Sequence, residues 1–409
     1  MPFDRFPLGD PPHGRRGPLQ GIRILDLTRV FMGPLATQIL ADQGADVVMI
    51  EALEGDTCRV MGPGPHPQLS GIALNLLRNK RSAQVDLKTA DGLDLVHRLA
   101  ATCDAVVTTM RPEVLRRLKL NYATISAIKP DVVYCQAQGF PLDGARANDP
   151  AYDDIIQAAT GAVDAMDRVW GQPRLMPTIL ADKVCGLVIS QAVTAALLQR
   201  HRTGQGQHVE VAMRESMIAF MLAEHGSGAI SEPPVSYPDT PAVGYPRVLS
   251  VERRPHATKD GLVHLFPYLP RHYAAIFAEV GRANSDRDPR YADQRATLRN
   301  SDSLYRDIRS IAGLRTTEEW LEYCRAVGIP ATRVATLQDL VDELPLATHP
   351  TVGRYRVIPA MARFGPMGDA VRRPAPLIGQ DTDDVVAELE AFSAESGAVE
   401  SGGFGGALQ

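Results

Sequence analysis

The first 140 residues alternate short apolar runs with stretches of helical length, and this alternation restricts the chain to few architectures. GIRILDL at 21–27 is suited to a buried strand, and Gly33-Pro34 then opens a predicted helix that Gly44 closes. ADVVMIE at 45–51 predicts the next strand. Strands that alternate with helices of this length imply a parallel sheet covered on both faces, which is an α/β fold. Further strands are predicted at 82–87, 104–109 and 131–138, with helices at 89–101, 112–119 and 122–128.

The pattern becomes helical after residue 152. Segment 181–204 is apolar almost all round and ends in basic residues and a glycine, which predicts a buried helix. Residues 231–255 hold six prolines and predict a linker or loop into another unit. The other predicted elements are a strand and helix within 209–228, a hairpin turn at Asp260-Gly261, helices near 152–160, 271–281 and 301–311, and an αβα pattern over 316–343 capped by Thr316 or Thr317.

The two ends are predicted to carry no chemistry. Residues 1–18 contain five prolines and predict an extended arm, which lacks the apolar region of a secretory signal. The tail from about residue 393 is rich in Gly, Ser, Ala and Glu, so we expect it to be disordered.

Composition excludes several classes of protein. The chain has 409 residues, of which 44% are hydrophobic and 22% charged, and these globular values exclude a collagen-like, coiled-coil or wholly disordered chain. A net charge of −5 gives no bulk attraction to nucleic acid or to a membrane. The five cysteines are far apart without a CxxC pair, so we predict no metal site and no disulfide framework. Without an uninterrupted apolar run of about 18 residues, we expect a cytoplasmic protein.

The turn at 28–34, TRVFMGP, argues against a dinucleotide-binding domain. Glu51 ends the second predicted strand, where a ribose-binding carboxylate would lie, but the turn lacks the GxGxxG glycines that admit a pyrophosphate. Val30, Phe31 and Met32 suit a stacked aromatic ring and an apolar arm better.

Basic residues gather near the ends of the predicted strands. Solvated charge on helix surfaces explains most residues of this kind. The alternative is an edge that binds phosphate, because ligands of open α/β sheets bind outside the carboxyl ends of the strands. Both interpretations stay open for the residues concerned, which are NKRS at 79–82, Lys88, Arg111, Arg116 and Arg117.

Asp182 stands at the start of the predicted 181–204 helix. As an N-cap, its side chain would accept hydrogen bonds from the first amides of the helix. The same position stabilises negative charge, so the carboxylate could serve as a nucleophile without a partner base, and the two interpretations are compatible. Asp153 and Asp154 raise the same ambiguity at the start of the 152–160 helix. No GxSxG elbow supports a Ser-His-Asp hydrolase.

Seven blocks in order resemble the class III CoA-transferases, whose superfamily holds formyl-CoA transferase, carnitine CoA-transferase and α-methylacyl-CoA racemase. The similarity runs from about residue 18 to 392. The blocks are 21–51, NLLRNKRSAQVDLKT at 75–89, MRPEVLRRLKLNY at 110–122, PAYDDIIQAATG at 150–161, ADK at 181–183, HRTGQGQHVEVAMRES at 201–216 and GIPATRV at 328–334.

The resemblance implies a Rossmann-like large domain with a parallel sheet, built from residues 1–226 and 331–409. A smaller α+β domain would occupy 227–330, and two ring-like chains would interlock as a homodimer. The implied function is transfer of coenzyme A from an acyl-CoA to an organic-acid carboxylate. Coenzyme A would be a substrate, and no tightly bound cofactor is expected.

The family's functional residues map onto specific positions of this sequence. Its nucleophilic aspartate falls on Asp182 and a second acidic position on Asp153. Lys88 and Arg117 would supply charge for the nucleotide phosphates. The full set of implied coenzyme A contacts is Val30, Phe31, Met32, Val85, Lys88, Thr109, Met110, Arg117 and Met213.

The implied mechanism is covalent. The carboxylate of Asp182 would form a mixed anhydride and then an aspartyl-CoA thioester, with backbone amides at the helix start stabilising the oxyanions. Asp153 would orient the acceptor or hydrogen-bond the intermediate.

Departures from formyl-CoA transferase argue against a formyl or oxalate substrate. That enzyme has a glutamine in place of Phe31, a cation in place of Ala52, and a glycine run with no counterpart in 231–262. Segment 253–261 instead resembles transferases of larger organic acids, and Arg253 or Arg254 would either meet an acceptor carboxylate or lie solvated.

Two alternatives to transfer stay open. The racemase branch needs a histidine just before the strand at 131–138, and ISAIKP at 125–130 has none, which favours the transferase. A coenzyme A-binding protein without catalysis is the second alternative, although Asp182 argues against it.

Overall fold

The structure, a computed structural model, describes residues 17–236, 241–282, 284–362, 364 and 371–401. Nearly all of the arm predicted at 1–18 and the last residues of the tail lie outside these ranges. The chain forms two compact units: the first comprises 1–159, 177–218 and 344–409, and the second comprises 160–176 and 219–343. The sequence placed the boundaries at 226 and 330, and it gave no sign that 160–176 belong with the second unit.

The first unit is built on a six-stranded sheet in which every neighbouring pair is parallel. The strand order is β3-β2-β1-β4-β5-β6, so the direction of winding reverses between β1 and β4. This order is that of a Rossmann-like fold and confirms the predicted α/β class. The strands are β1 (Arg23–Leu27), β2 (Asp46–Glu51), β3 (Lys80–Gln84), β4 (Ala105–Thr108), β5 (Val133–Gln138) and β6 (Gln207–Ala212).

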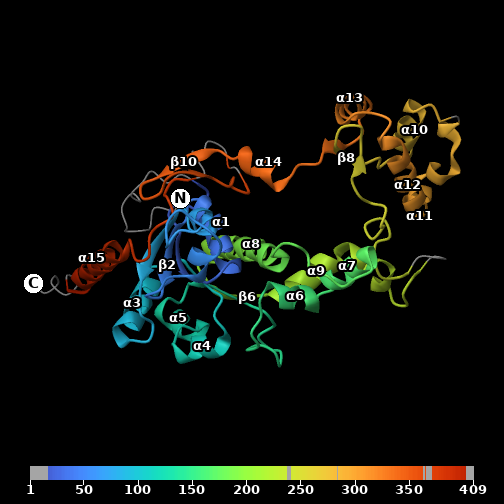
Figure 1. The fold of residues 1–409 in the computed structure, drawn as a ribbon. Helices are drawn as coiled ribbons and strands as arrows, with labels where there is room; N and C mark the ends of the chain where they lie inside the picture. Colours follow the sequence, from blue (N-terminus) through green and yellow to red (C-terminus); the bar gives the residue numbers. More distant parts are fainter. Residues whose placement is uncertain (1–16, 237–240, 283, 363, 365–370, 402–409) are drawn as a thin grey trace, which may run out of the picture. The chain divides into compact units, whose positions relative to one another are not determined.

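Helices cover both faces of this sheet, and Figure 1 shows α8 beside α1 and the C-terminal helix beside β3. On one face lie α1 (Met32–Asp42) and α8 (Leu180–Thr203). On the other lie α3 (Ala90–Ala101), α4 (Pro112–Arg117), α5 (Tyr122–Ile128) and α15 (Thr382–Ser401). The first unit also contains η1 (Thr57–Val60), α2 (Gly71–Leu76), α6 (Asp153–Ala159), and a hairpin of β10 (Leu346–His349) and β11 (Gly353–Arg356).

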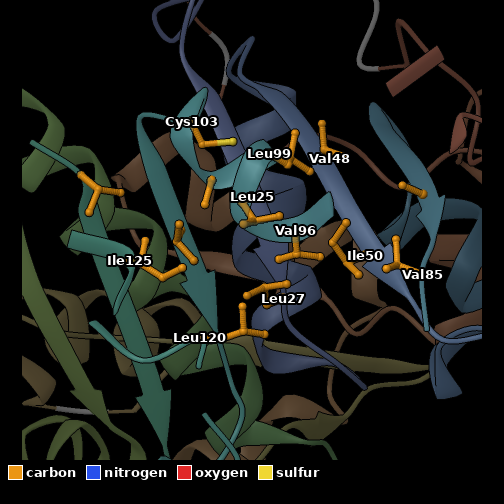
Figure 2. Packing of buried hydrophobic residues seen from close by; sticks show 14 of the residues in the cluster. Leu25, Leu27, Val48, Ile50, Val85, Val96, Leu99, Cys103, Leu120 and Ile125 are labelled. Carbon is orange, nitrogen blue, oxygen red and sulfur yellow. The ribbon is translucent and has the colours of Figure 1, made fainter. Parts of the chain in front are cut away.

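Alternate residues of the central strands point into the core beneath α3. Figure 2 shows Leu25 and Leu27 of β1 facing Val96 and Leu99 of α3, with Ile50 of β2 close by. These side chains are buried because a strand covered on both faces has no solvent side. The β-branched and leucine-rich runs of the sequence therefore correctly predicted the central strands β1 and β2.

The second unit combines a small antiparallel sheet with helices. Trp320, Tyr273 and Phe277 fill its core. The predicted hairpin at Asp260-Gly261 is confirmed, since β7 (His256–Ala257) pairs with β8 (Leu262–Leu265), which also pairs with β9 (Ala331–Arg333). The other α-helices of this unit are α7 (Ala162–Trp170), α10 (Pro270–Glu279), α11 (Gln294–Arg299), α12 (Ser301–Ala312), α13 (Thr317–Val327) and α14 (Leu337–Asp342). Its short 3₁₀ helices are η2 (Ser227–Ile230), η3 (Ser285–Arg287) and η4 (Pro289–Tyr291). Helix α9 (Met213–His225) crosses the boundary between the units.

Both interpretations of the basic residues, solvated surface charge and a phosphate-binding edge, are wrong for Lys80 and Arg81, which lie buried inside the sheet. Because β3 begins at Lys80 and not at 82, both side chains are at the amino end of the strand. Lys80 Nζ lies 3.2 Å from Asp26 Oδ2, with neither side chain exposed. Arg81 pairs with Asp46 at 2.6 Å and with Glu388 of α15 at 2.7 Å. The charges are tolerated in a buried strand because each has a carboxylate partner.

The tail predicted to be disordered from about residue 393 is helical as far as Ser401. Its residues 391–401 are rich in Ala and Glu, which are good helix formers, and the preceding part of α15 is anchored by Val385 and Leu389 in the core. Residues 402–409 lie outside the described ranges.

Helix α8 has the length and hydropathy of a membrane span, although polar residues interrupt its apolar run. Its 24 residues include an 18-residue window with a mean hydropathy of 1.4. The helix packs against α1, α6, β5 and β6, so it is a core helix of the first unit. The predicted helix is confirmed, but it is buried on one side only, since Leu187 and Leu198 are 46% and 58% exposed.

The buried pair of Lys80 and Asp26 makes the stability of the first unit sensitive to loss of either charge. Lys80→Met leaves Asp26 buried without a cation, and we expect the free energy of unfolding in urea to fall by about 3–5 kcal/mol. Adding Asp26→Asn should recover most of this loss, since an amide still hydrogen-bonds Thr37 without a buried charge. The exposed Lys119→Met serves as the control. Equal losses in the single and double variants would contradict the argument.

Candidate functional site

The turns that follow β1 and β4 meet where the winding of the sheet reverses. The backbone N–H of Arg29 donates to Thr109 Oγ1 at 3.1 Å. Ligands of open α/β sheets bind outside the strand ends at this reversal point. The structure therefore brings together Val30, Phe31 and Met32 with Thr109 and Met110, which the sequence had assigned to one ligand.

Asp56, which sequence reasoning missed, holds the first of these turns. Val30 has a φ of 73°, in the left-handed region that a β-branched residue rarely adopts. Its N–H donates to both carboxylate oxygens of Asp56, at 3.2 and 3.1 Å. The N–H of Asp56 in turn donates to Glu51 Oε1 at 2.9 Å. In the sequence, the only local sign of this role is the acidic residue that ends the segment EGD at 54–56.

Glu51 does not face a ligand. Its carboxylate accepts hydrogen bonds from Arg59 Nε at 2.6 Å and from Ser82 Oγ at 2.5 Å, and the Arg59 and Glu51 side chains are each 1% exposed. A carboxylate used in this way cannot bind a ribose, in agreement with the absence of a GxGxxG turn.

Three of the remaining predicted contacts, Val85, Lys88 and Arg117, lie along the same edge of the sheet. Val85 and Met110 pack in the apolar cluster beneath α3. Lys88, after β3, and Arg117, in the last turn of α4, are exposed. Neither cation forms an ion pair with a described residue, and no hydrogen bond or ion pair between described residues joins either to Asp182. Both charges are therefore available to an anionic ligand.

The start of α8 is capped by Asp153 and not by Asp182. Asp153 Oδ1 accepts the N–H groups of Ala181 at 2.7 Å and of Asp182 at 3.2 Å. Its Oδ2 accepts from Gln157 Nε2 at 2.6 Å, a contact that the sequence gave no sign of. Interpreting Asp182 as the N-cap is wrong, because α8 begins at Leu180 and the residue lies inside the first turn.

The first turn of α8 also has no free amide for an oxyanion. The N–H groups of Ala181 and Asp182 are taken by Asp153, and the N–H of Lys183 donates to the carbonyl of Ile179 at 3.2 Å. The expectation that these amides stabilise oxyanions is therefore wrong for this conformation.

The carboxyl group of Asp182 is half-buried and accepts no hydrogen bond from any residue that the structure describes. Burial raises its pKa to about 6, and the charges of Asp153 and Asp154 add to the increase. The helix start therefore does not keep this pKa low. At pH 7 and above the group is still mostly ionised, yet it is poorly solvated, which makes it a more reactive nucleophile.

The next turn of α8 contacts the backbone of Met32 and of Met213. Gly186 packs so closely on α1 that an added Cβ would lie 3.0 Å from the carbonyl oxygen of Met32. The thiol of Cys185 donates to the carbonyl of Met213 at 3.8 Å. Helix α8 thus contacts the chain just after the carboxyl ends of β1 and β6, whereas Lys88 and Arg117 lie along the edge beyond β3 and β4. No cluster of three potential metal ligands occurs in the described ranges.

Comparison with known proteins shows the family. The family model described as CoA-transferase family III matches residues 19–382. This chain belongs to CoA-transferase family III. The resemblance drawn from the seven sequence blocks is thus confirmed.

Individual relatives match over nearly their whole length. The Mycobacterium tuberculosis protein named "Probable fatty acyl-CoA transferase Rv3272" is 31% identical over 381 residues, or 89% of this chain and 96% of that protein. Its crystal structure aligns with a TM-score of 0.75 at 28% identity, covering 90% of this chain and 99% of that one. A succinate–glutarate CoA-transferase of Agrobacterium fabrum is 30% identical over 395 residues, or 92% and 97% of the two chains. A CaiB/BaiF family protein of Brucella suis gives a TM-score of 0.75 at 25% identity, with coverage of 92% and 100%.

Replacing Asp153 should separate its capping role from its charge. Asp153→Ala removes the acceptor of two amides, and we expect a loss of about 1–2 kcal/mol in urea unfolding. Asp153→Asn keeps an oxygen acceptor but removes the negative charge, so the pKa of Asp182 should fall. Carboxyl ¹³C NMR of aspartate-labelled protein, assigned with Asp182→Asn, measures this shift. Asp154→Asn is the control and should cause a smaller decrease; an equal decrease would contradict the assignment.

We expect this protein to become more stable when Asp182 is replaced by an uncharged residue. Because the folded pKa lies above the unfolded value of 3.8, ionisation of Asp182 destabilises the folded state increasingly from about pH 4 to pH 6, and fully above pH 6. Asp182→Asn should add on the order of 1 kcal/mol at pH 7.5, a value reduced for partial solvent exposure, and nothing below about pH 4. Urea unfolding across this range, with the exposed Asp143→Asn as control, measures the difference. A gain that did not change with pH would refute this cause.

Proposed function

We propose that this protein transfers coenzyme A from an acyl-CoA to an organic-acid carboxylate, with Asp182 as covalent nucleophile. The observation that carries the proposal is a partly desolvated carboxylate without hydrogen-bond donors among the described residues. It lies on the helix whose next turn contacts the backbone of Met32 and Met213, two predicted coenzyme A contacts. Membership of CoA-transferase family III supports the same reaction class.

The first half-reaction needs no proton transfer. An Asp182 oxygen attacks the thioester carbon, the carbon–sulfur bond breaks, and the coenzyme A thiolate leaves with the electron pair. The thiolate then attacks Cγ of the mixed anhydride and expels the donor carboxylate, which leaves an aspartyl-CoA thioester. The acceptor carboxylate reverses these steps and returns Asp182 as a carboxylate. Asp182 therefore requires positioning more than deprotonation.

Asp153 acts in this scheme as a positioning residue. By accepting two amides of the first turn of α8, it fixes the backbone that carries Asp182. Its negative charge raises the energy of the Asp182 carboxylate, and this repulsion is relieved when Asp182 becomes a neutral anhydride or thioester. Donors for the oxyanions then come from residues outside the first turn.

The coenzyme A nucleotide would lie along the strand ends, with its phosphates near Lys88 and Arg117 and its arm near Val30, Phe31 and Met32. The acceptor would be an organic acid larger than formate or oxalate, and the name of the Agrobacterium relative gives succinate and glutarate for that enzyme. A homodimer in the cytoplasm completes the proposal.

The racemase remains the second candidate because it shares the fold. The loop before β5, residues 129–132, contains no histidine, so the second base of a racemase is missing from its usual place. A non-catalytic coenzyme A-binding protein is the third candidate.

Intact-protein mass spectrometry tests the covalent step. Mixing the protein with succinyl-CoA, acetyl-CoA or a fatty acyl-CoA should give a coenzyme A-sized adduct, and Asp182→Asn should give none, because an amide cannot form the anhydride. Deuterium incorporation at C2 of a 2-methylacyl-CoA without an adduct would favour the racemase. Retention of coenzyme A with neither result would favour the binding protein.

Neutralising Lys88 or Arg117 should weaken acyl-CoA binding without affecting the chemistry. We expect Lys88→Gln and Arg117→Gln each to raise KM for the acyl-CoA about tenfold, since each charge-assisted hydrogen bond contributes about 1.5–3 kcal/mol. The value of kcat should stay the same, and the exposed Lys119→Gln is the control. Steady-state kinetics with varied acyl-CoA measure both constants; a fall in kcat with KM unchanged would contradict phosphate binding.

A further inference from the structure

The small sheet of the second unit carries a row of four stacked rings that the proposed chemistry does not use. His256 of β7 stacks on His264 of β8 with ring centroids 6.3 Å apart. Phe266 and Tyr268 extend the row at spacings of 6.1 and 6.0 Å. Because side chains alternate along a strand, His264, Phe266 and Tyr268 lie on the face opposite the buried Val263 and Leu265, and Tyr268 is 48% exposed.

Two guanidinium groups lie over the middle of this row. The Cζ atom of Arg247 is 4.6 Å from the centroid of Phe266 and 4.9 Å from that of Tyr268. The Cζ atom of Arg253 is 5.9 Å from the same Phe266 ring. Cation–π attraction holds each cation in place, but it does not cancel the repulsion between the two charges.

Neither arginine has a carboxylate partner within the described part of the chain. Arg247 is only 4% exposed, and it donates Nε to the Tyr305 hydroxyl at 2.7 Å and Nη2 to the Pro267 carbonyl at 3.3 Å. Arg253 is exposed and forms no ion pair. A buried guanidinium without a counter-ion is unfavourable, so an anion at this position would stabilise the unit.

Neighbouring residues increase the positive charge. Arg254, Arg306 and Arg309 all pair with the single carboxylate of Glu252. The Nδ1 atoms of His256 and His264 are buried and have no hydrogen-bond partner among the described residues. Burial lowers the pKa of His256 to about 4, with His264 and the arginines contributing, so this imidazole is neutral at pH 7.

We infer that the arginine–ring face, formed by Arg247, Arg253, His264, Phe266 and Tyr268, binds an organic carboxylate with a planar unsaturated body. The guanidinium fork of Arg253 matches the two oxygens of a carboxylate, and the rings offer a flat apolar contact to the rest of the molecule. The choice of a carboxylate over a phosphate rests on the proposed function, in which the acceptor is an organic acid.

Titration calorimetry of the full-length protein with benzoate tests this binding. Arg253→Gln should raise the Kd of benzoate at least tenfold, while Arg325→Gln, an exposed arginine of α13, should leave it unchanged. Arg247→Lys, which keeps the charge but loses the fork, should also weaken binding. Because Arg253 is exposed, its variant is expected to fold, and circular dichroism checks this. An unchanged Kd in Arg253→Gln overturns the inference.

Two further probes define the ligand class. Acetate should bind at least tenfold more weakly than benzoate, and equal affinities would overturn the role of the rings. Inorganic phosphate should bind more weakly than benzoate, and equal or tighter binding would overturn the carboxylate in favour of a general anion site. In histidine-labelled protein, benzoate should shift the ¹⁵N signal of His264, and an unchanged signal would place the benzoate elsewhere and overturn the inference.

The outcomes also separate this inference from the proposed function. If the aspartyl-CoA adduct forms and the Kd of benzoate is unchanged in Arg253→Gln, only the inference about the arginine–ring face is overturned. Absence of the adduct together with Arg253-dependent benzoate binding would overturn only the transferase mechanism.

Discussion

The hydrogen bonds between Asp153 and the first turn of α8 fix the backbone that carries Asp182, and the charge of Asp153 raises the pKa of the Asp182 carboxyl group. They satisfy two amides that would otherwise lack partners at a buried helix start. They also bring a second negative charge close to Asp182, whose pKa is raised to about 6. The same contact therefore stabilises the helix and destabilises the ionised form of the proposed nucleophile, as expected where a protein sacrifices stability for reactivity.

The rest of the site depends on the turns at the carboxyl ends of the parallel strands. Reversal of the winding between β1 and β4 opens the edge where Thr109 meets the turn after β1. Asp56 holds Val30 in a left-handed conformation there, and Gly186 lets α8 approach α1 without a side chain between them. Backbone geometry positions the predicted coenzyme A contacts more than side-chain packing does.

The sequence predicted the strands well because β-branched and apolar runs are required where a sheet is buried on both faces. It misplaced the start of β3, because Lys80 and Arg81 look like surface charges until their partners Asp26, Asp46 and Glu388 are known. Those partners lie far away in the chain. Likewise, Asp182 was found through its family motif, but the cap at Asp153 depends on a contact between two helices that no local pattern reports.

Three buried or half-buried charged residues of this chain have different surroundings, and these surroundings indicate different roles. Lys80 is fully buried and has a carboxylate partner, so it serves stability. Asp182 is half-buried beside like charges, which suits a group that loses its charge when it reacts. Arg247 is buried beside Arg253 with no carboxylate among the described residues, which suits a group completed by an external anion. Charges that the fold leaves uncompensated are thus the positions where a substrate or ligand can supply the missing interaction.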